Sequence, residues 1–423
     1  MTEIKKTVFG LEAIAHQDAA FFKELAAAFR PICLNRLSGS DLELHNDVSA
    51  KVARLLKQRT NITITLNLNK DRGPNAWVYP PQLNRNHSLY QDGMKHYITN
   101  IDGLKHLNKA ADKMLQGTLD HNKVWVTGIF SEISCPVDVT LGLLNMATAE
   151  EVAAIFLHEI GHVWSYFELL TLAAKTNLAL RTVRQEFLNA DAETKIVIVR
   201  ESASALGFTA EEIEAIQKSK SVDRVEVAVI NSQVRASYSE LGFSLYDQRG
   251  WEFASDQFST RMGGGAHVVT GLDKMHRKYG DPVYRSLFTH VVGNVIETFS
   301  FILLSVGTAG LFPLLMLVIG DPFCQGEIYD RPKERFTRVK HELIAYLRNS
   351  STDKTRVAEV LNDLATIDKA LSKMQDRYGV GYYFWALISP AGRRNRNNVA
   401  VQQALEVLAN NELYVAAAQL RTM

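Results

Sequence analysis

One short stretch of the chain carries residue types and a spacing suited to metal chemistry. Residues 158–162 read His-Glu-Ile-Gly-His, an HExxH motif. On a helix, residues four apart lie on one face, so both imidazoles can point at a single metal ion. Glu159 is rotated by about 100° around the helix axis from His158, so its carboxylate can reach a metal-bound water without ligating the metal. The motif therefore predicts a zinc site with a general base beside it.

The residues around the motif predict a buried helix. Thr148 and Glu151 form a capping-box pattern at its start. A broad apolar surface follows at helical spacing, and it comprises Val152, Ile155, Phe156, Ile160, Val163 and Phe167. Gly161, between the two histidines, would allow another segment to pack closely. The alternative is a surface helix with two spare histidines, for which polar neighbours would be expected.

A second stretch, residues 251–258, supplies two carboxylates at helical spacing. Glu252 and Asp256 are four apart, where like charges repel each other unless a positive group lies near them. Glu252 can therefore be the third metal ligand, and Asp256 can accept a hydrogen bond from the far nitrogen of a ligand histidine. A solvated acidic face is the alternative, and three aromatic neighbours argue against it: Trp251, Phe253 and Phe258. The glycines at 263–265 predict the end of this helix.

Other zinc arrangements fit the sequence less well. Glu168 stands six residues after His162, where a metzincin would have a histidine, and Ser165 occupies the position of its turn glycine. The third ligand should therefore come from a separate element. The alternatives to Glu252 are three isolated histidines: His267, His276 and His290.

Together these stretches resemble gluzincin zinc metallopeptidases of the HtpX and CAAX prenyl protease type. The similar run covers most of residues 139–163, and residues 75–77 are similar to the Asn-Ala-aromatic strand of that family. Residues 252–256 resemble its Glu-x-x-Ala-Asp pattern, with Ser255 in place of the alanine. The resemblance covers about residues 75–275, with an extra segment near 82–122.

The resemblance implies a zincin-like fold, one Zn²⁺ per chain and a protein or peptide substrate. It also implies His158, His162 and Glu252 as zinc ligands and Glu159 as the catalytic base. The family carries a later His-Pro followed by an arginine, whereas here Arg331 replaces that histidine and the spacing is short. The residue that stabilises the oxyanion therefore stays open, and its candidates are His267, Tyr329, Arg331 and Arg335.

Hydrophobic periodicity predicts an α+β fold that is mostly helical, with a small sheet packed on the HExxH helix and a helical C-terminal extension. Strands are expected at 60–69, 75–79, 123–130 and 136–140, and helices at 11–30, 40–58, 104–114, 171–205, 209–219 and 222–241. The last strands before the motif are candidates for a sheet edge that binds an extended peptide; the alternative is ordinary core strands. The domains expected are a helical segment (1–58), a zincin-like domain (59–335) and a helical region (336–423). In that last region, an apolar face at 357–374 predicts an intramolecular helix pair.

Composition limits the classes of partner. The net charge of +1 gives no electrostatic case for nucleic acid. The three cysteines, Cys33, Cys135 and Cys324, form neither a disulfide framework nor a zinc site, which favours a reducing compartment. The N-terminus lacks the apolar core of a signal peptide, so we expect a cytoplasmic protein or one packaged in a larger assembly.

An uncharged stretch at 298–320 is long enough to span a membrane, but Gly307, Gly310 and Pro313 divide it. We expect a buried helical hairpin there, and membrane contact is the alternative.

Two functions follow from these observations. The first is a zinc-dependent endopeptidase, in which Glu159 assists the attack of a zinc-bound water on a peptide bond. The second is a structural or interaction component of a larger assembly, built on a zincin scaffold with little or no proteolysis. The segment 82–122, the change at Arg331 and the C-terminal helices, which could bind a partner protein, favour the second function. The intact Glu159 favours the first.

Overall fold

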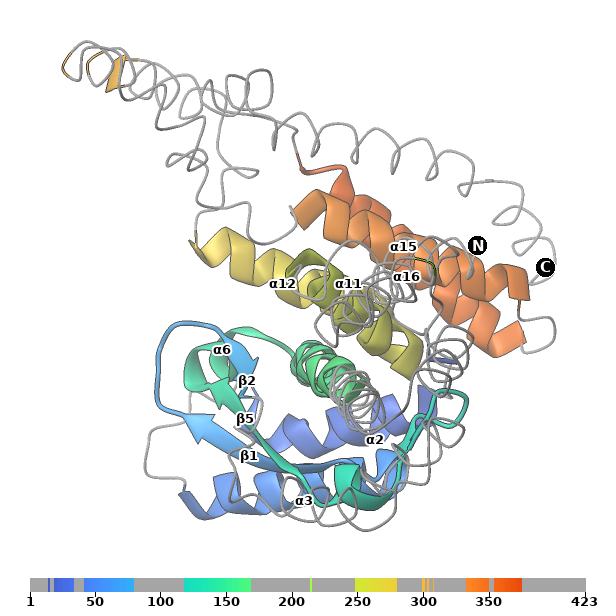
Figure 1. Ribbon diagram of the computed structural model, residues 1–423. Coiled ribbons are helices and arrows are strands. Elements are labelled where there is room, and N and C mark those ends of the chain that lie inside the picture. Colours follow the sequence, from blue (N-terminus) through green and yellow to red (C-terminus); the bar gives the residue numbers. More distant parts are fainter. Residues whose placement is uncertain are drawn as a thin grey trace.

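The computed structural model describes residues 14–15, 19–33, 42–79, 118–168, 248–279, 332–349 and 354–374, together with a few isolated positions. Within these residues the protein is mostly helical and has a small mixed sheet (Figure 1), as the sequence predicts. The helices expected at 104–114, 171–205, 209–219 and 222–241 lie outside the described residues, apart from the helical residue 214.

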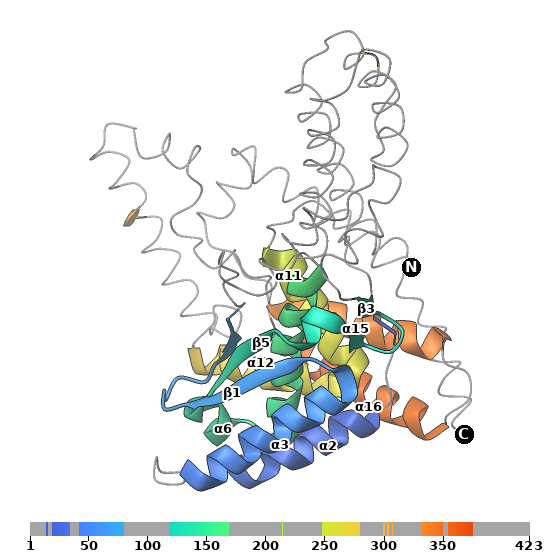
Figure 2. The ribbon, with the colours of Figure 1, turned by 60° about the horizontal axis from the view of Figure 1, so that its bottom comes forward.

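Two amphipathic helices come first, α2 (Ala19–Phe29) and α3 (Leu42–Thr60). They confirm the helices predicted at 11–30 and 40–58 over these bounds. Figure 2 shows them side by side beneath the sheet, and α3 packs against the first strand. Their inner faces are apolar and buried, with Phe21, Phe22, Leu25, Phe29, Val48, Val52 and Leu56. Burial of these side chains holds the pair on the core.

The main sheet has three strands in the order β1-β5-β2. Strand β5 (Ser134–Thr140) pairs in parallel with β1 (Thr63–Asn69), with Leu66 opposite Val137. On its other side it pairs antiparallel with β2 (Ala76–Val78). All three strands were predicted. Of the two alternatives for the last strand before the motif, the structure bears out the ordinary core strand, because neighbours on both sides use the backbone groups of β5. Among the described strands, β1 and β2 lie at the edges of this sheet.

The strand predicted at 123–130 is also wrong over most of its length. Only β4 (Trp125–Val126) is extended, and it pairs with β3 (Leu119–Asp120). The chain then enters η3 (Gly128–Ser131), a short 3₁₀ helix. Gly128 has φ 56°, which an extended strand cannot contain. Its glycine therefore turns the chain before the strand can continue.

A central helix, the motif helix, carries the HExxH sequence and spans residues 149–168 of the described chain. Helix α6 (Leu141–Met146) leads into it from β5. The predicted capping box is present, because the Thr148 amide donates to Glu151 Oε2 (2.8 Å) and the Glu151 amide donates to Thr148 Oγ1 (3.2 Å). The motif helix is buried almost throughout, with Phe156 and Phe167 fully enclosed. It lies between the sheet and the later helices (Figure 1).

Helix α11 (Gln248–Ser259) ends in a π-helical segment, η4 (Thr260–Gly264). The predicted helix end at 263–265 is confirmed, since Gly263 has φ 107° and Gly265 has φ 40°. A further helix that the sequence did not predict, α12 (Gly265–Tyr279), begins at once. Gly265 has a positive φ that other residues rarely adopt, and a Cβ there would lie 2.2 Å from Asp363 Oδ2, so a substitution would be strained.

Two C-terminal helices cover the far side of α11 and α12. They are α15 (Pro332–Asn349) and α16 (Lys354–Leu371). Helix α15 runs without interruption across the domain boundary predicted between residues 335 and 336. The apolar face of α16 is buried through Val357, Val360, Leu364 and Ile367. Both helices pack on each other and on α12, which confirms the predicted intramolecular helix pair.

Within the described ranges, no helix has the length and apolar character needed to cross a membrane. Most of the stretch 298–320 lies outside these ranges. Phe299 and Leu303 are described, and with exposed fractions of 67% and 63% they contradict the predicted buried hairpin at these two positions. An apolar sequence favours burial, but a side chain is buried only where another surface packs against it.

Candidate metal centre

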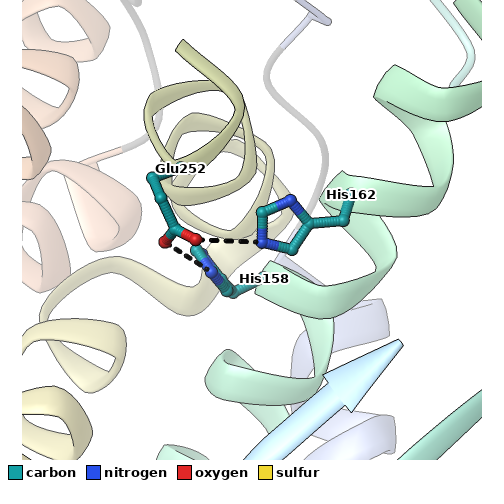
Figure 3. A group of neighbouring side chains, drawn as sticks. All are labelled: His158, His162 and Glu252. Atoms are coloured by element: carbon teal, nitrogen blue, oxygen red, sulfur yellow. Dashed lines mark ion pairs between the residues drawn. The ribbon is translucent and has the colours of Figure 1, made fainter. Parts of the chain in front are cut away.

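Two helices bring three potential metal ligands together. His158 and His162 project from one face of the motif helix toward Glu252 on α11 (Figure 3). The His158 Nε2 atom lies 3.3 Å from Glu252 Oε2, and the His162 Nε2 atom lies 3.5 Å from Glu252 Oε1. His158 and Glu252 are buried, and His162 is partly buried. The structure thus places the three predicted ligands around one point.

The separations within this group suit a small divalent ion. One ligand atom from each residue can be chosen so that all lie within 4.8 Å of one another. In a tetrahedral zinc site with bonds of about 2.0–2.2 Å, neighbouring ligand atoms lie about 3.3–3.6 Å apart. Two imidazoles and one carboxylate also form a donor set found in catalytic zinc sites. The residues therefore fit a metal ion, and this is the one such group among the described residues.

Close contact between the two helices depends on Gly161. A Cβ added at Gly161 would lie 2.6 Å from the Ser255 Cα and 3.0 Å from the Phe258 Cβ. Backbone atoms cannot move aside cheaply, so a larger residue would push α11 away from the motif helix. The close packing predicted at Gly161 is confirmed, and α11 is the segment that packs there.

Asp256 lies behind His158, at the predicted place, and the contact between the two is a close ion pair. Its Oδ1 atom is 2.9 Å from His158 Nδ1, the nitrogen that faces away from Glu252. Arg335, from α15, forms a two-pronged ion pair with the same carboxylate: Nε donates to Oδ2 (2.9 Å) and Nη2 to Oδ1 (2.7 Å). The Arg335 Nη2 atom also lies 3.1 Å from Glu252 Oε2. One cation therefore contacts both carboxylates of the site.

His162 has a different partner. Its Nδ1 atom lies 2.9 Å from the hydroxyl oxygen of Ser255, which is fully buried. The sequence predicted no role for Ser255, which stands where the Glu-x-x-Ala-Asp pattern has an alanine. The available signal was the replacement of that apolar residue by one with a hydroxyl group.

The charges in this cluster shift the pKa values of its members. Burial alone would lower the pKa of His158, but the hydrogen bonds and charges of Asp256 and Glu252 raise it to about 10. Burial alone would raise the pKa values of Glu252 and Asp256; the positive charge of Arg335 and the contact with His158 hold both well below their ordinary range. Without a metal ion, the site is thus a network of charged groups.

Glu159, the predicted base, is buried and sits in the field of the same cluster. Burial raises its pKa, whereas the nearby His162 and His158 act in the opposite direction. A raised pKa brings a carboxylate closer to the range in which it can accept and return a proton near neutral pH.

Of the four candidate oxyanion stabilisers, the structure describes two. Arg335 contacts Asp256 and Glu252. His267 stacks on Phe22, with ring centroids 5.6 Å apart. Tyr329 and Arg331 lie outside the described residues. Of the alternatives to Glu252, His267 and His276 are not in the metal-binding group, and His290 lies outside the described residues.

Comparison of the chain with protein-family models, with curated proteins and with solved structures finds no match.

Proposed function

We propose that this protein is a zinc-dependent metallopeptidase that hydrolyses peptide bonds in proteins, similar in type to the HtpX and CAAX prenyl proteases. The observation that carries the proposal is the convergence of three ligand side chains from two helices at separations of 3.3 and 3.5 Å. Glu159 follows the first of these ligands in the chain and is itself buried. A purely structural metal site has no need of such a carboxylate.

Each residue has a distinct task in this proposal. His158, His162 and Glu252 would hold the ion. When bound, zinc would supply a Lewis acid that polarises a carbonyl group and lowers the pKa of a water molecule. Glu159 would accept a proton from the attacking water and pass it to the leaving amine. Asp256 orients His158 and is held by Arg335, so the ligands keep their geometry while the substrate reacts.

The resemblance supports zinc as the metal, and the donor set is compatible with it. Imidazole also suits copper, iron and nickel, so the choice of metal is open to direct measurement.

The second candidate is a structural or interaction component built on the same scaffold. The contacts of Arg335 favour it, because this arginine engages Asp256 and Glu252. His267 likewise lies against Phe22. Both contacts engage side chains that were candidates for stabilising a developing oxyanion. In this case the protein would bind the metal but cleave no peptide.

The test is a comparison of Glu159→Gln with the wild type. We expect the variant to retain zinc, because Glu159 is not a ligand, and to lose cleavage of an unfolded protein substrate by at least about 100-fold. Glu150→Gln is the matched control: Glu150 lies on the same helix and pairs with Arg30 at the surface (2.9 Å), so its cleavage rate should equal that of the wild type.

Undiminished cleavage by Glu159→Gln would contradict the role of Glu159. A wild-type protein that binds zinc and cleaves no peptide in a proteome-derived library would favour the second candidate.

A further inference from the structure

We propose that Ser255 is a positioning residue that fixes the ring orientation and the tautomer of His162 for metal binding. This inference rests on the proposed metal centre and adds a role that the His-His-Glu set does not contain. It starts from one contact, the 2.9 Å separation between Ser255 Oγ and His162 Nδ1. The opposite nitrogen of the same ring, Nε2, faces Glu252.

Packing explains why such a short side chain can reach the ring. Gly161 has no Cβ, so α11 approaches the motif helix until the Ser255 Cα would lie only 2.6 Å from a Cβ at that position. Ser255 has an exposed fraction of 0%. The Ser255 hydroxyl is therefore held against the His162 ring and is shielded from water, which could otherwise replace it as the partner of Nδ1.

The chemistry of imidazole then assigns the proton. A neutral imidazole carries a hydrogen on one nitrogen and a lone pair on the other. A metal ion at the three-residue group needs the lone pair of His162 Nε2, so the hydrogen has to be on Nδ1. That Nδ1–H donates to the Ser255 hydroxyl oxygen. Without this acceptor, the Nδ1–H group would lose the hydrogen bond to Ser255, and the metal-binding tautomer would lose stability.

Helix α11 therefore supplies three functions from one face. Glu252 is a ligand, Ser255 orients His162, and Asp256 orients His158; these positions are spaced i, i+3 and i+4. The two orienting groups differ in charge. The Asp256 carboxylate is held by Arg335, whereas Ser255 contributes a neutral acceptor. Ser255 thus gives His162 a hydrogen-bond acceptor that adds no negative charge to the site.

The test compares two serine-to-alanine variants of the full chain. Ser259 lies one turn after Ser255 on α11, is also 0% exposed, and donates its hydroxyl to the Ala154 carbonyl oxygen (2.6 Å). Ser259→Ala therefore removes an equally buried hydroxyl that does not contact a histidine. Zinc affinity is measured by competition with a chelator, using Zn²⁺ alone. We expect Ser255→Ala to weaken zinc binding by about 10-fold or more, and Ser259→Ala to leave it at the wild-type value.

A second readout follows the proton itself. In the zinc-loaded wild type, the imidazole ¹⁵N spectrum should show a slowly exchanging Nδ1–H on His162. Ser255→Ala should lose this signal, while the corresponding signal of His158, which faces Asp256, persists. A general loss of structure would affect both histidines, so the pair of signals separates positioning from folding.

Three results would overturn the inference. They are unchanged zinc affinity in Ser255→Ala, equal losses in Ser255→Ala and Ser259→Ala, and a His162 Nδ1–H signal that does not depend on Ser255. A wild-type protein that binds no zinc would overturn the proposed metal centre as well. Neither readout measures peptide cleavage, so a failure of the peptidase proposal alone would not affect this test.

Discussion

The two helices that form the candidate metal centre are held by different kinds of interaction. The motif helix is embedded in apolar side chains: Phe156 packs edge-on against Phe29, and Phe167 stacks on Phe130. Helix α11 instead meets α15 along a buried polar seam. The seam comprises the contacts of Glu252, Asp256 and Gln257 on α11, together with Arg261 in the adjoining η4, with Arg335 and Glu342 on α15.

The seam contains two separate ion-pair groups. Arg335 holds Asp256 and Glu252 beside the two histidines. Further along α15, Glu342 accepts hydrogen bonds from Gln257 Nε2 on α11 (2.9 Å) and from Arg261 Nε (3.0 Å) and Nη2 (2.9 Å) in η4. All of these side chains are buried.

The difference shows how each helix is positioned. Apolar packing places the backbone of the motif helix, and the helix spacing then aims its histidines. Apolar contacts set no direction for a carboxylate, so α11 depends on charged partners to orient Glu252 and Asp256. Buried ion pairs add little net stability when compared with apolar side chains, but they cost much when one member is removed. The seam therefore fixes the orientation of the two carboxylates, but removal of one of its members would cost much stability.

The largest expected effect comes from breaking the seam at the metal centre. Arg335→Met would leave two buried carboxylates without their arginine partner. We expect the metal-free protein to lose about 3 kcal/mol or more of unfolding free energy, measured by urea denaturation. Lys340→Met is the matched control on the same helix, because Lys340 pairs with Asp368 at a partly exposed site (2.6 Å) and should cost no more than about 1 kcal/mol. Equal losses in the two variants would contradict the distinction between the seam and the surface.

The second effect is a pH dependence of metal binding. In the metal-free protein the pKa of His158 is raised to about 10, so this ring is protonated at neutral pH. Metal binding needs its lone pair and must release the proton. Between about pH 6 and pH 8, zinc affinity should therefore rise by about tenfold per pH unit for one proton released.

Calorimetry in buffers of different ionisation enthalpy counts the released protons directly.

In the metal-free protein, the stability of the fold depends on pH with the opposite sign. The stability that His158 gains from its acidic partners is present below its ordinary pKa and is lost as the pH rises through about 10. Zinc affinity that does not change with pH would contradict the charged network around His158.

The smallest effect tests the motif helix. Thr148→Ala removes the hydroxyl that accepts from the Glu151 amide. It should cost about 1 kcal/mol of unfolding free energy, the usual value of an N-cap. Zinc affinity should stay unchanged, because packing along the whole helix, and not its first turn, aims His158 and His162. A clear loss of affinity in Thr148→Ala would show that the apolar surroundings alone do not position the histidines.

Much of the centre could be predicted because its signals are local. Two histidines four apart, two carboxylates four apart and a capping box each lie within one or two turns of helix. The alternating pattern of β1 and the amphipathic pattern of α3 are local in the same sense. The peptidase activity and the identity of the metal stay predictions.

The rest depends on contacts between residues far apart in sequence. Arg335 and Asp256 are 79 positions apart, and nothing near either residue indicates the other. The central place of β5 depends on its parallel pairing with β1, which periodicity does not reveal. Ser255 has a role only because α11 approaches Gly161 closely. Helix α12 was not predicted, because the three glycines at 263–265 indicate the end of one helix and do not indicate that another begins.

The most direct test of the central claim is the zinc stoichiometry of the wild type and of Glu252→Gln. Protein stripped of metal is titrated with Zn²⁺ and its metal content is measured after dialysis, with Glu24→Gln as a surface control, since Glu24 pairs with Arg59 (2.9 Å). We predict one zinc ion per chain in the wild type and in the control, and binding at least about tenfold weaker in Glu252→Gln. A wild type that retains no zinc, or a Glu252→Gln variant that binds it equally well, would contradict the account.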